Sequence, residues 1–270
     1  MNNKPVGIFD SGVGGLTVVR AVLEELPNEN IIYFGDTARV PYGPRDLNEV
    51  KGFVFEIVEF LQREGVKIVV IACNTGTAAG LADAQKYFDI PIIGVIEPGA
   101  RAAVQATVNR RIGVIGTKGT INSSSYNKAI HAFDAGIDVY TQACPPFVEF
   151  VERGETTGPR IEAVVEKHVT PLKNAQVDTI ILGCTHYPLL TSVISKEMGE
   201  NVKLINSATE TAYEVRENLT RRGFLRNEKS PQEYRFIVSG DDKAFLSLSQ
   251  RFLGRKIDEV EKISLGERVK

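Results

Sequence analysis

The sequence predicts an α/β protein made of two pseudo-symmetric, doubly wound domains with mainly parallel sheets. Short apolar, β-branched runs alternate with amphipathic stretches at helical spacing along the 270 residues, which is the pattern of βαβ units. Two of these runs, at residues 68–79 and 179–190, share one layout, in which a buried strand ends in a small residue, a cysteine and polar residues. Because ligands bind at the carboxyl edge of such sheets, the two cysteines suggest a two-sided site with a thiol on each face.

The composition favours a folded protein without a nucleic-acid or membrane partner. The 32 basic and 34 acidic residues nearly balance, so no strong field attracts nucleic acid. No apolar run approaches the roughly 20 residues of a membrane helix, and the first residues lack a signal-peptide core. We therefore expect a cytoplasmic protein whose 3 cysteines are free thiols. Because they are sparse and form no C-x-x-C pair, they do not indicate a metal site.

The first half of the chain alternates strands and helices. We expect strands at residues 6–9, at 31–35, from 68 to the first cysteine, and at 91–96, with helices at 16–26, 47–63 and 78–88. A glycine-rich turn at residues 10–15 follows the first strand. It is either a tight turn with a capping Asp or Ser, or a cradle for an anionic group, although it matches no nucleotide-binding fingerprint. The loop at 36–44 presents Tyr42, whose hydroxyl either donates to a ligand carboxylate or packs internally.

The second half repeats this order after a junction at residues 97–99. We expect helices at 100–107, 122–133, 147–153 and 160–172, and strands at 111–115, 137–142, before the second reactive-looking cysteine, and at 202–205, with a turn at 116–120. A helix at 208–222 and a strand at 235–239 with a final helix then return to the first sheet. The predicted domains are therefore residues 1–97 plus 208–270, and residues 98–207.

The two strand-end cysteines, Cys73 and Cys184, allow acid–base chemistry. An unperturbed thiol has a pKa near 8.5, and helix N-termini close to a strand end are expected to favour the thiolate. Thiols on opposite faces of a planar carbanion can remove a proton and return one to the other face, which is racemisation or epimerisation without a cofactor. The alternative is that a buried cysteine is only a small apolar residue, and we expect this for Cys144, which precedes two prolines. His131 and His168 fall within helical patterns and are expected on the surface.

Five blocks together resemble the glutamate racemases of the aspartate/glutamate racemase superfamily. They are DSGVGGLT at residues 10–17, PYG at 41–43, ACNT at 72–75, EPG at 97–99 and GCTHYP at 183–188, in order across nearly the whole chain. The resemblance implies an isomerase that interconverts L- and D-glutamate without a cofactor or metal. It also implies two pseudo-symmetric α/β domains with the active site in the cleft between them. It further implies a supply of D-glutamate for peptidoglycan, hence for cell-wall biogenesis and cell shape. A homodimer of either family geometry is also implied.

The resemblance also implies roles for individual residues. Cys73 would act on the proton of D-glutamate with help from Asp10, and Cys184 on the proton of L-glutamate with help from His186 and Glu152. The substrate-binding residues would be Asp10, Ser11, Tyr42, Gly43, Asn74, Thr75, Thr117, Thr120, Thr185 and His186. Two positions depart from the family pattern, since Glu149 replaces a common proline and Gly76 a common alanine. The first departure makes Glu149 the alternative to Glu152.

Three other functions remain open from the sequence. An aspartate or hydantoin racemase of the same superfamily would keep both cysteines, because substrate length is set by pocket shape. A non-catalytic amino-acid-binding protein on this scaffold would be expected to lose one thiol, whereas this chain has both. A thiol peroxidase or redox sensor would be expected to carry a resolving cysteine close to the reactive one.

Overall fold

Two parallel sheets form the framework of the computed structural model, which describes residues 2–227 and 231–265. The larger sheet has the order β10 (Glu261–Lys262), β9 (Tyr234–Val238), β2 (Ile31–Gly35), β1 (Val6–Asp10), β3 (Ile68–Ile71) and β4 (Ile92–Gly94). The smaller sheet has the order β6 (Asp138–Ala143), β5 (Arg111–Gly116), β7 (Thr179–Gly183) and β8 (Lys203–Asn206). Neighbouring strands are parallel throughout. The predicted class, a doubly wound α/β protein with two mainly parallel sheets, is confirmed.

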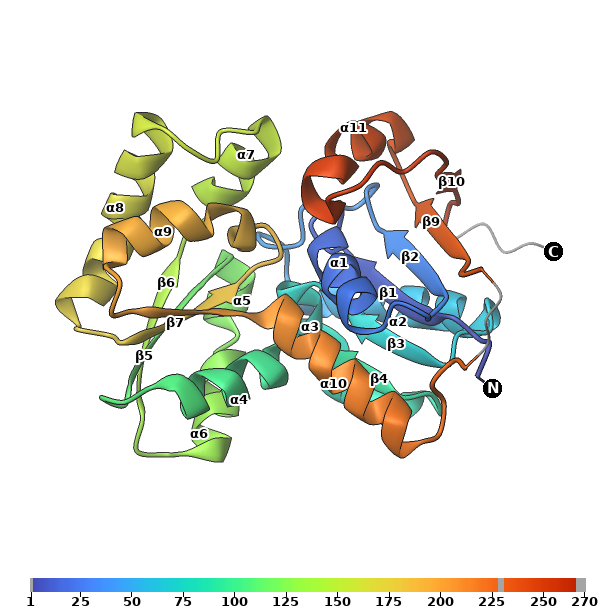
Figure 1. Cartoon of the computed structure of the whole chain (residues 1–270), viewed down its shortest axis with the longest axis horizontal. Coiled ribbons are helices and arrows are strands. Elements are labelled where there is room, and N and C mark those ends of the chain that lie inside the picture. Colours follow the sequence, from blue (N-terminus) through green and yellow to red (C-terminus); the bar gives the residue numbers. More distant parts are fainter. Residues whose placement is uncertain (1, 228–230, 266–270) are drawn as a thin grey trace.

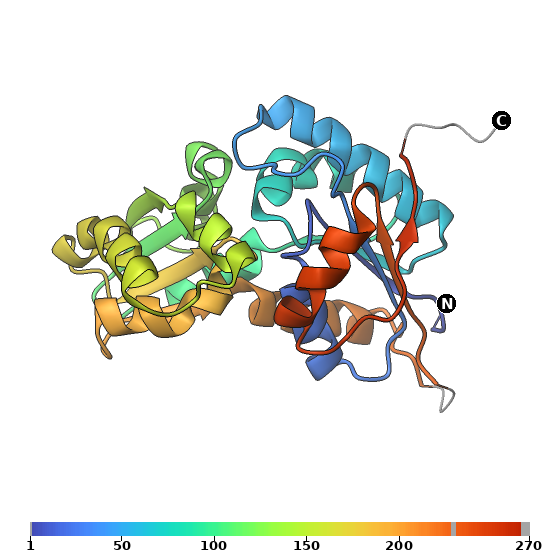
Figure 2. The ribbon, with the colours of Figure 1, turned by 90° about the horizontal axis from the view of Figure 1, so that it is seen from above.

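Helices cover both sheets and join them. The larger sheet packs with α1 (Leu16–Glu25), α2 (Leu47–Arg63), α3 (Asn74–Tyr87) and α11 (Asp242–Leu253). The smaller sheet packs with α5 (Lys118–Asn122), α6 (Ser125–Phe133), α7 (Pro146–Arg153), α8 (Pro159–Asn174) and α9 (Thr191–Met198), the last preceded by a 3₁₀ turn at Tyr187–Leu190. Two helices, α4 (Ile96–Ala106) and α10 (Ser207–Arg221), carry the chain from one sheet to the other and back. Each sheet with its helices forms one lobe, and the lobes lie side by side (Figures 1 and 2).

The return of the chain to the larger sheet follows the sequence expectation. Strand β9 pairs with β2 in parallel, so segments far apart in sequence share this sheet. The exact division into residues 1–97 plus 208–270 and residues 98–207 stays a prediction. One buried apolar cluster includes residues of both sheets, for example Val70 of β3 and Leu182 of β7, so the lobes share part of their core.

Helix α2 shows why several bounds were predictable. Asp46 precedes it and accepts a hydrogen bond from the Asn48 amide at 2.8 Å, while Gly65 just beyond its end has a φ of +77°, which a side chain disfavours. Strand β3 is equally clear, because its residues are buried on both faces. The capping residue, the glycine and the apolar run are all visible in the sequence, which is why both elements were predictable.

Other elements differ from the sequence expectation. Helix α3 begins at Asn74 rather than 78, so Cys73 is its N-cap residue. The junction expected at residues 97–99 lies inside the first turn of α4, where Pro98 loses no intrahelical hydrogen bond. The turn expected at 116–120 is the start of α5, capped by the Thr117 hydroxyl. Helix α9 and strand β10 were not predicted.

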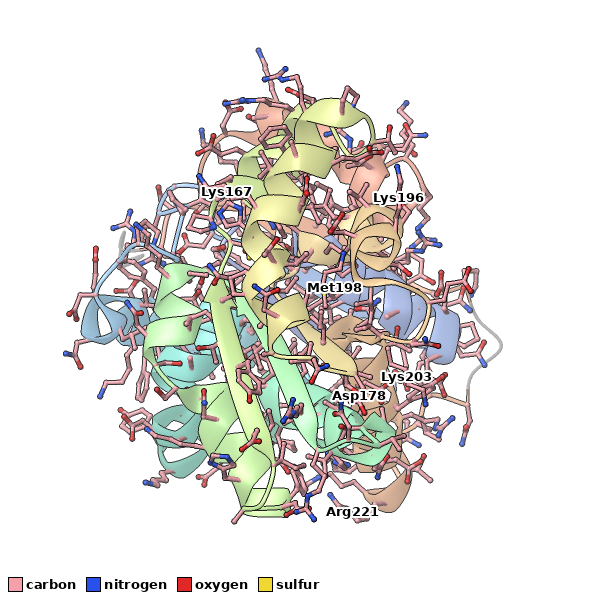
Figure 3. All side chains as sticks on the ribbon, turned by 90° about the vertical axis from the view of Figure 1, so that its left-hand side faces the viewer. Lys167, Asp178, Lys196, Met198, Lys203 and Arg221 are labelled. Carbon is pink, nitrogen blue, oxygen red and sulfur yellow. The ribbon has the colours of Figure 1, made fainter. Side chains whose placement is uncertain are left out.

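The outer face of the smaller sheet's lobe is polar and mixed in charge. Lys167 of α8, Lys196 of α9 and Lys203 of β8 are exposed there (Figure 3). Asp178, just before β7, accepts hydrogen bonds from the amides of Val108 and Asn109 at 2.7 Å each and so ties the α4–β5 connection to the sheet. Among the described residues, no helix is both long and apolar enough to span a bilayer.

Candidate active site

A cavity of about 390 Å³ lies between the lobes, where the carboxyl ends of β1, β3 and β7 meet. Its lining includes every residue expected to bind substrate or act on it, except Thr120. The remaining lining residues are Val40, Pro41, Pro44, Lys118, Pro145, Val148 and Glu149. Cys73 comes from the larger sheet's lobe and Cys184 from the smaller one, and each residue is 7 % exposed. The structure therefore brings both thiols to one cavity from opposite lobes.

Cys73 lies beside a buried carboxyl group. The Asp10 side chain is buried at the end of β1, and its Oδ2 accepts a hydrogen bond from the Gly15 amide at 2.8 Å. Burial raises the pKa of Asp10, although the nearby His186 charge and this amide oppose the rise. A carboxyl group with a raised pKa is able to accept a proton from a neighbouring thiol.

The pKa of the Cys73 thiol is raised, whereas the sequence predicts that it is lowered. Burial and the charge of Asp10 raise its pKa, and the charge of Cys184 adds to the rise, so these effects outweigh the Gly76 amide at the start of α3. The helix N-terminus alone therefore does not make Cys73 a thiolate. Cys73 is therefore the protonated partner, and the expectation of a lowered pKa is wrong for it.

Cys184 has an imidazole–carboxylate pair beside it. His186 Nε2 lies 3.0 Å from Glu152 Oε1, which projects from α7. Burial lowers the pKa of His186, but hydrogen bonds with Cys184 and Glu152 and the charges of these two residues raise it by more than burial lowers it. The net result is a pKa of about 10. His186 is therefore an imidazolium at neutral pH. Glu149, the alternative to Glu152, has a side chain that is 68 % exposed and pairs with Arg153.

Polar side chains cross the cleft beside the thiols. Asn74 Oδ1 accepts a hydrogen bond from the Tyr126 hydroxyl at 2.7 Å, which leaves its buried Nδ2 without a partner among the described residues. The hydroxyls of Thr75 and Thr117 lie 2.9 Å apart and join the two lobes. Thr120 does not line the cavity, because it lies behind these two and hydrogen-bonds to both. Its expected substrate contact is replaced by a supporting one.

Tyr42 lines the cavity with a hydroxyl that is already engaged. The ring is 1 % exposed and the hydroxyl donates to Asp36 Oδ2, which also accepts from Arg39 Nε at 2.7 Å. The possibility that this hydroxyl binds a ligand carboxylate is thus disfavoured, and what Tyr42 and Gly43 can offer a ligand is backbone. Gly43 itself contacts the opposite lobe, because its carbonyl accepts from the Gly119 amide at 2.8 Å.

The other cysteine and histidines lie outside the cavity. Cys144 is fully buried in the apolar core and its thiol donates to the Gln142 carbonyl at 3.6 Å, as expected for a packing residue. His131 and His168 both bond to backbone carbonyls. Sequence reasoning missed Lys118 and Val148 of the lining, since neither belongs to a motif; a long basic or apolar side chain next to a motif residue was the available signal. No cluster suited to a metal ion occurs among the described residues.

The glycines of the 10–15 turn have a role that sequence did not reveal. A Cβ on Gly14 would lie 2.6 Å from the His186 ring and closer still to the Thr185 hydroxyl. Next along the chain, the Thr17 hydroxyl donates to the Thr185 carbonyl at 3.1 Å. The turn is therefore more than a tight bend, and its expected role as a cradle for an anionic group stays a prediction. It lets the 183–188 segment of the other lobe approach β1 closely.

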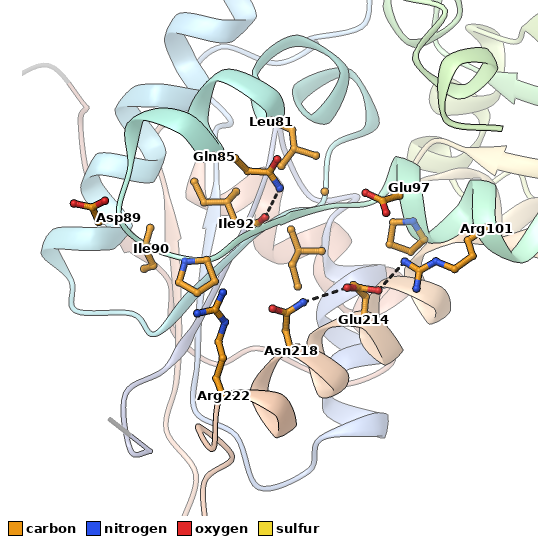
Figure 4. A pocket seen from close by; sticks show the side chains of 14 residues that line it. Leu81, Gln85, Asp89, Ile90, Ile92, Glu97, Arg101, Glu214, Asn218 and Arg222 are labelled. Atoms are coloured by element: carbon orange, nitrogen blue, oxygen red, sulfur yellow. Dashed lines mark hydrogen bonds and ion pairs between the residues drawn. The ribbon is translucent and has the colours of Figure 1, made fainter. Parts of the chain in front are cut away.

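A second cavity, of about 410 Å³, lies away from the thiols along α4 and α10 (Figure 4). Arg101 and Glu214 pair across these connecting helices at 2.7 Å, and Asn218 donates to Glu214 at 3.1 Å. Its lining contains no thiol. Among the described residues, the two cysteines expected to act on substrate thus line the first cavity and not the second.

Comparison with known proteins places this geometry in a family. A family model described as Asp/Glu/hydantoin racemase matches residues 12–215. A glutamate racemase of Corynebacterium diphtheriae is 51% identical over 264 residues, which cover 98% of this chain and 99% of that protein. The crystal structure of a glutamate racemase isoform from Bacillus anthracis superposes with a TM-score of 0.94 at 47% identity, covering 98% of this chain and 99% of that one. The glutamate racemase of Francisella tularensis, solved in complex with D-glutamate, gives a TM-score of 0.93 at 36% identity over 98% of this chain and 99% of that one. The chain belongs to the Asp/Glu/hydantoin racemase family, among its glutamate racemases.

Proposed function

We propose that this enzyme interconverts L- and D-glutamate by a two-base mechanism in which Cys73 and Cys184 act on opposite faces of Cα. The observation that carries this proposal is the pair of buried thiols, one from each lobe, lining a single cavity with a separate titratable partner for each. Relatives that are glutamate racemases support glutamate over aspartate or a hydantoin as the substrate. In this role the enzyme supplies D-glutamate for peptidoglycan synthesis.

The protonation states on the two sides support a direction for each thiol. The raised pKa of His186, which lies within hydrogen-bond reach of Cys184, supports an imidazolium on that side of the cavity, while the raised pKa of Cys73 keeps its proton in place. This form accepts L-glutamate: Cys184 takes the α-proton and Cys73 gives its own to the other face. For D-glutamate the roles exchange, and Asp10 assists Cys73 in losing its proton.

The carbanion formed at Cα needs stabilisation from groups that are already oriented. The unpartnered Nδ2 of Asn74 and the hydroxyl of Thr75 are donors on one wall, and Thr185 lies on the other. Because the site is largely buried, such donors act in a low dielectric, where they are worth more than in water. Closure of the two lobes over glutamate would remove the remaining water.

Isotope exchange tests the mechanism directly. Each enantiomer of glutamate is incubated in deuterium oxide with the wild type, Cys73→Ala or Cys184→Ala, and deuterium at Cα and optical rotation are followed. Both variants should lose racemisation, while Cys184→Ala should still exchange the proton of D-glutamate and Cys73→Ala that of L-glutamate. The matched control is Cys144→Ala, which should racemise normally. Normal racemisation by both single variants would refute the two-base scheme, and faster turnover of aspartate would refute the substrate.

The assembly and location extend the proposal. We expect a homodimer in the cytoplasm, where D-glutamate is used. Sedimentation with and without glutamate measures the state of assembly, and a monomer at all concentrations would contradict it.

A further inference from the structure

Arg251 of helix α11 hydrogen-bonds across the lobes to the backbone of helix α7. Arg251 Nη1 donates to the carbonyls of Val151 and Glu152, each at 2.8 Å. These carbonyls belong to the last turn of α7, where the helix dipole is negative, and the Val151 carbonyl also accepts a hydrogen bond from the Gly154 amide at 3.0 Å. The guanidinium is therefore placed where a cation stabilises a helix end. In Figure 1, α7 and α11 lie on the adjoining sides of the two lobes.

The glycine that follows α7 leaves room for this contact. Gly154 follows the helix with a φ of +80°, and a Cβ there would lie 2.8 Å from Arg251 Nη2. A side chain at residue 154 would therefore push the guanidinium away from α7 as well as strain the backbone. The helix end thus supplies the acceptors for Arg251, and Gly154 leaves the space that its guanidinium occupies.

The neighbouring residue on α11 contacts the other half of the same acid–base pair. Phe252 is 1 % exposed, and its ring meets the His186 ring edge-on with centroids 5.0 Å apart. His186 in turn holds Glu152 Oε1 at 3.0 Å. Arg251 thus fixes the backbone of Glu152 while Phe252 fixes the ring that Glu152 must meet.

Burial alone cannot position the two partners equally. The His186 side chain is 9 % exposed, whereas that of Glu152 is 40 % exposed. A half-exposed carboxylate on the last turn of an 8-residue helix keeps its place only if the backbone beneath it is held.

We propose that Arg251 is a positioning residue for the Cys184 side of the reaction. By hydrogen-bonding to the end of α7 from α11, it holds Glu152 within hydrogen-bond distance of His186 when the lobes are closed. This inference rests on the proposed two-thiol function. Glu152 and His186 both belong to the smaller sheet's lobe, whereas Arg251 comes from the other lobe. Closure of the lobes would therefore add this support to the pair in the same motion that closes the site.

Primary isotope effects on both directions provide the test. The enantiomers of glutamate have equal free energies, so kcat/KM must be equal in the two directions for every variant, and the ratio of rates carries no information about one side. Isotope effects do carry it. If proton abstraction by Cys184 slows, this abstraction becomes more rate-limiting with [2-²H]-L-glutamate, and the primary isotope effect on kcat/KM for L-glutamate rises. With [2-²H]-D-glutamate, abstraction by Cys73 becomes less limiting and the effect falls.

For Arg251→Ala we expect kcat/KM to fall about 10- to 100-fold, the range of a sub-ångström to 1 Å misplacement, with this opposed change in the two isotope effects. Arg251→Lys should recover part of the activity, since it restores the cation. Gln250→Ala, an exposed neighbour on α11, is the matched control and should match the wild type. Asp10→Asn should shift the isotope effects in the reverse sense, because it weakens the Cys73 side.

The outcomes separate this inference from the function beneath it. Unchanged isotope effects or a parallel change in both directions for Arg251→Ala, with the expected reverse shift in Asp10→Asn, would overturn the positioning role while leaving two-base racemisation intact. Absence of racemisation by the wild type would overturn the function itself. If Arg251→Ala does not fold, Gly154→Ala and Arg251→Lys decide the matter, since both loosen the same contact and must show the same opposed pattern.

Discussion

Replacing Gly14 with alanine should disable the enzyme by pushing the opposite lobe out of position. The new methyl group would lie 2.6 Å from the His186 ring, which is 0.8 Å less than the 3.4 Å at which ordinary contacts begin. The ring cannot yield freely, because it is bonded to Glu152 on one side and packed against Phe252 on the other. The 183–188 segment as a whole must therefore retreat, and Cys184 with it.

The loss follows from the size of that retreat. A displacement approaching 1 Å at a catalytic group costs on the order of 10²-fold in rate. For a shift of 0.8 Å we expect kcat/KM to fall roughly 10- to 100-fold, or about 1.4–2.7 kcal/mol of transition-state stabilisation. The cavity itself remains, so KM should rise less than kcat falls.

Gly12→Ala provides a control from the same turn. A Cβ there would meet only Val40 Cγ2, at 3.4 Å, which is an ordinary contact. Racemisation followed by circular dichroism, with thermal unfolding measured in parallel, should show a nearly normal Gly12→Ala and a folded but slow Gly14→Ala. Equal damage in both variants would show that the turn matters for its backbone conformation, and normal activity of Gly14→Ala would refute the steric argument.

Three further predictions concern other parts of the molecule. Glu152→Gln removes a charge that raises the pKa of His186, so the alkaline limb of the kcat/KM profile should move to lower pH; an unmoved limb would contradict the assigned pair. Glu29→Gln leaves the buried ammonium of Lys67 unpaired and should destabilise the fold by about 3–5 kcal/mol in denaturant unfolding, whereas a small change would show that the carbonyls around Lys67 suffice. Cys144→Ala should racemise normally and lose only about 1 kcal/mol of stability, and inactivity would mean that this thiol does more than pack.

The fold was predictable where local signals and the tertiary structure agree. Strand β3 is apolar because both faces are covered, and α2 carries its own start and stop signals. The junction at residues 97–99 was misplaced because Glu-Pro-Gly looks like a break, yet a proline in a first helical turn costs nothing. Strand β10 is two residues long and exposed, and only its pairing with β9 makes it a strand.

The site residues were predictable as motifs, but their states were not. The motifs gave the two cysteines, and the structure places both in one cavity. The tuning of Cys73 depends on burial and on Asp10, which is remote in sequence, so reasoning from the strand end and helix dipole gave the wrong sign. Tyr42 shows the same limit. Its hydroxyl donates to Asp36, and this contact depends on a loop conformation that the local sequence pattern does not predict.

In the two-thiol mechanism that we propose, the different partners of Cys73 and Cys184 determine which protonation form of the free enzyme is favoured. In this mechanism, the form with a protonated Cys73 beside a carboxyl group of raised pKa, and with an imidazolium next to Cys184, takes a proton from L-glutamate. Each turnover leaves the opposite form, and a further turnover in the same direction requires protons to move back. Since kcat/KM is equal for both enantiomers, a preference for one resting form can appear only in kcat and KM separately. We therefore expect the direction that starts from the favoured form to have the lower KM and, in the same proportion, the lower kcat.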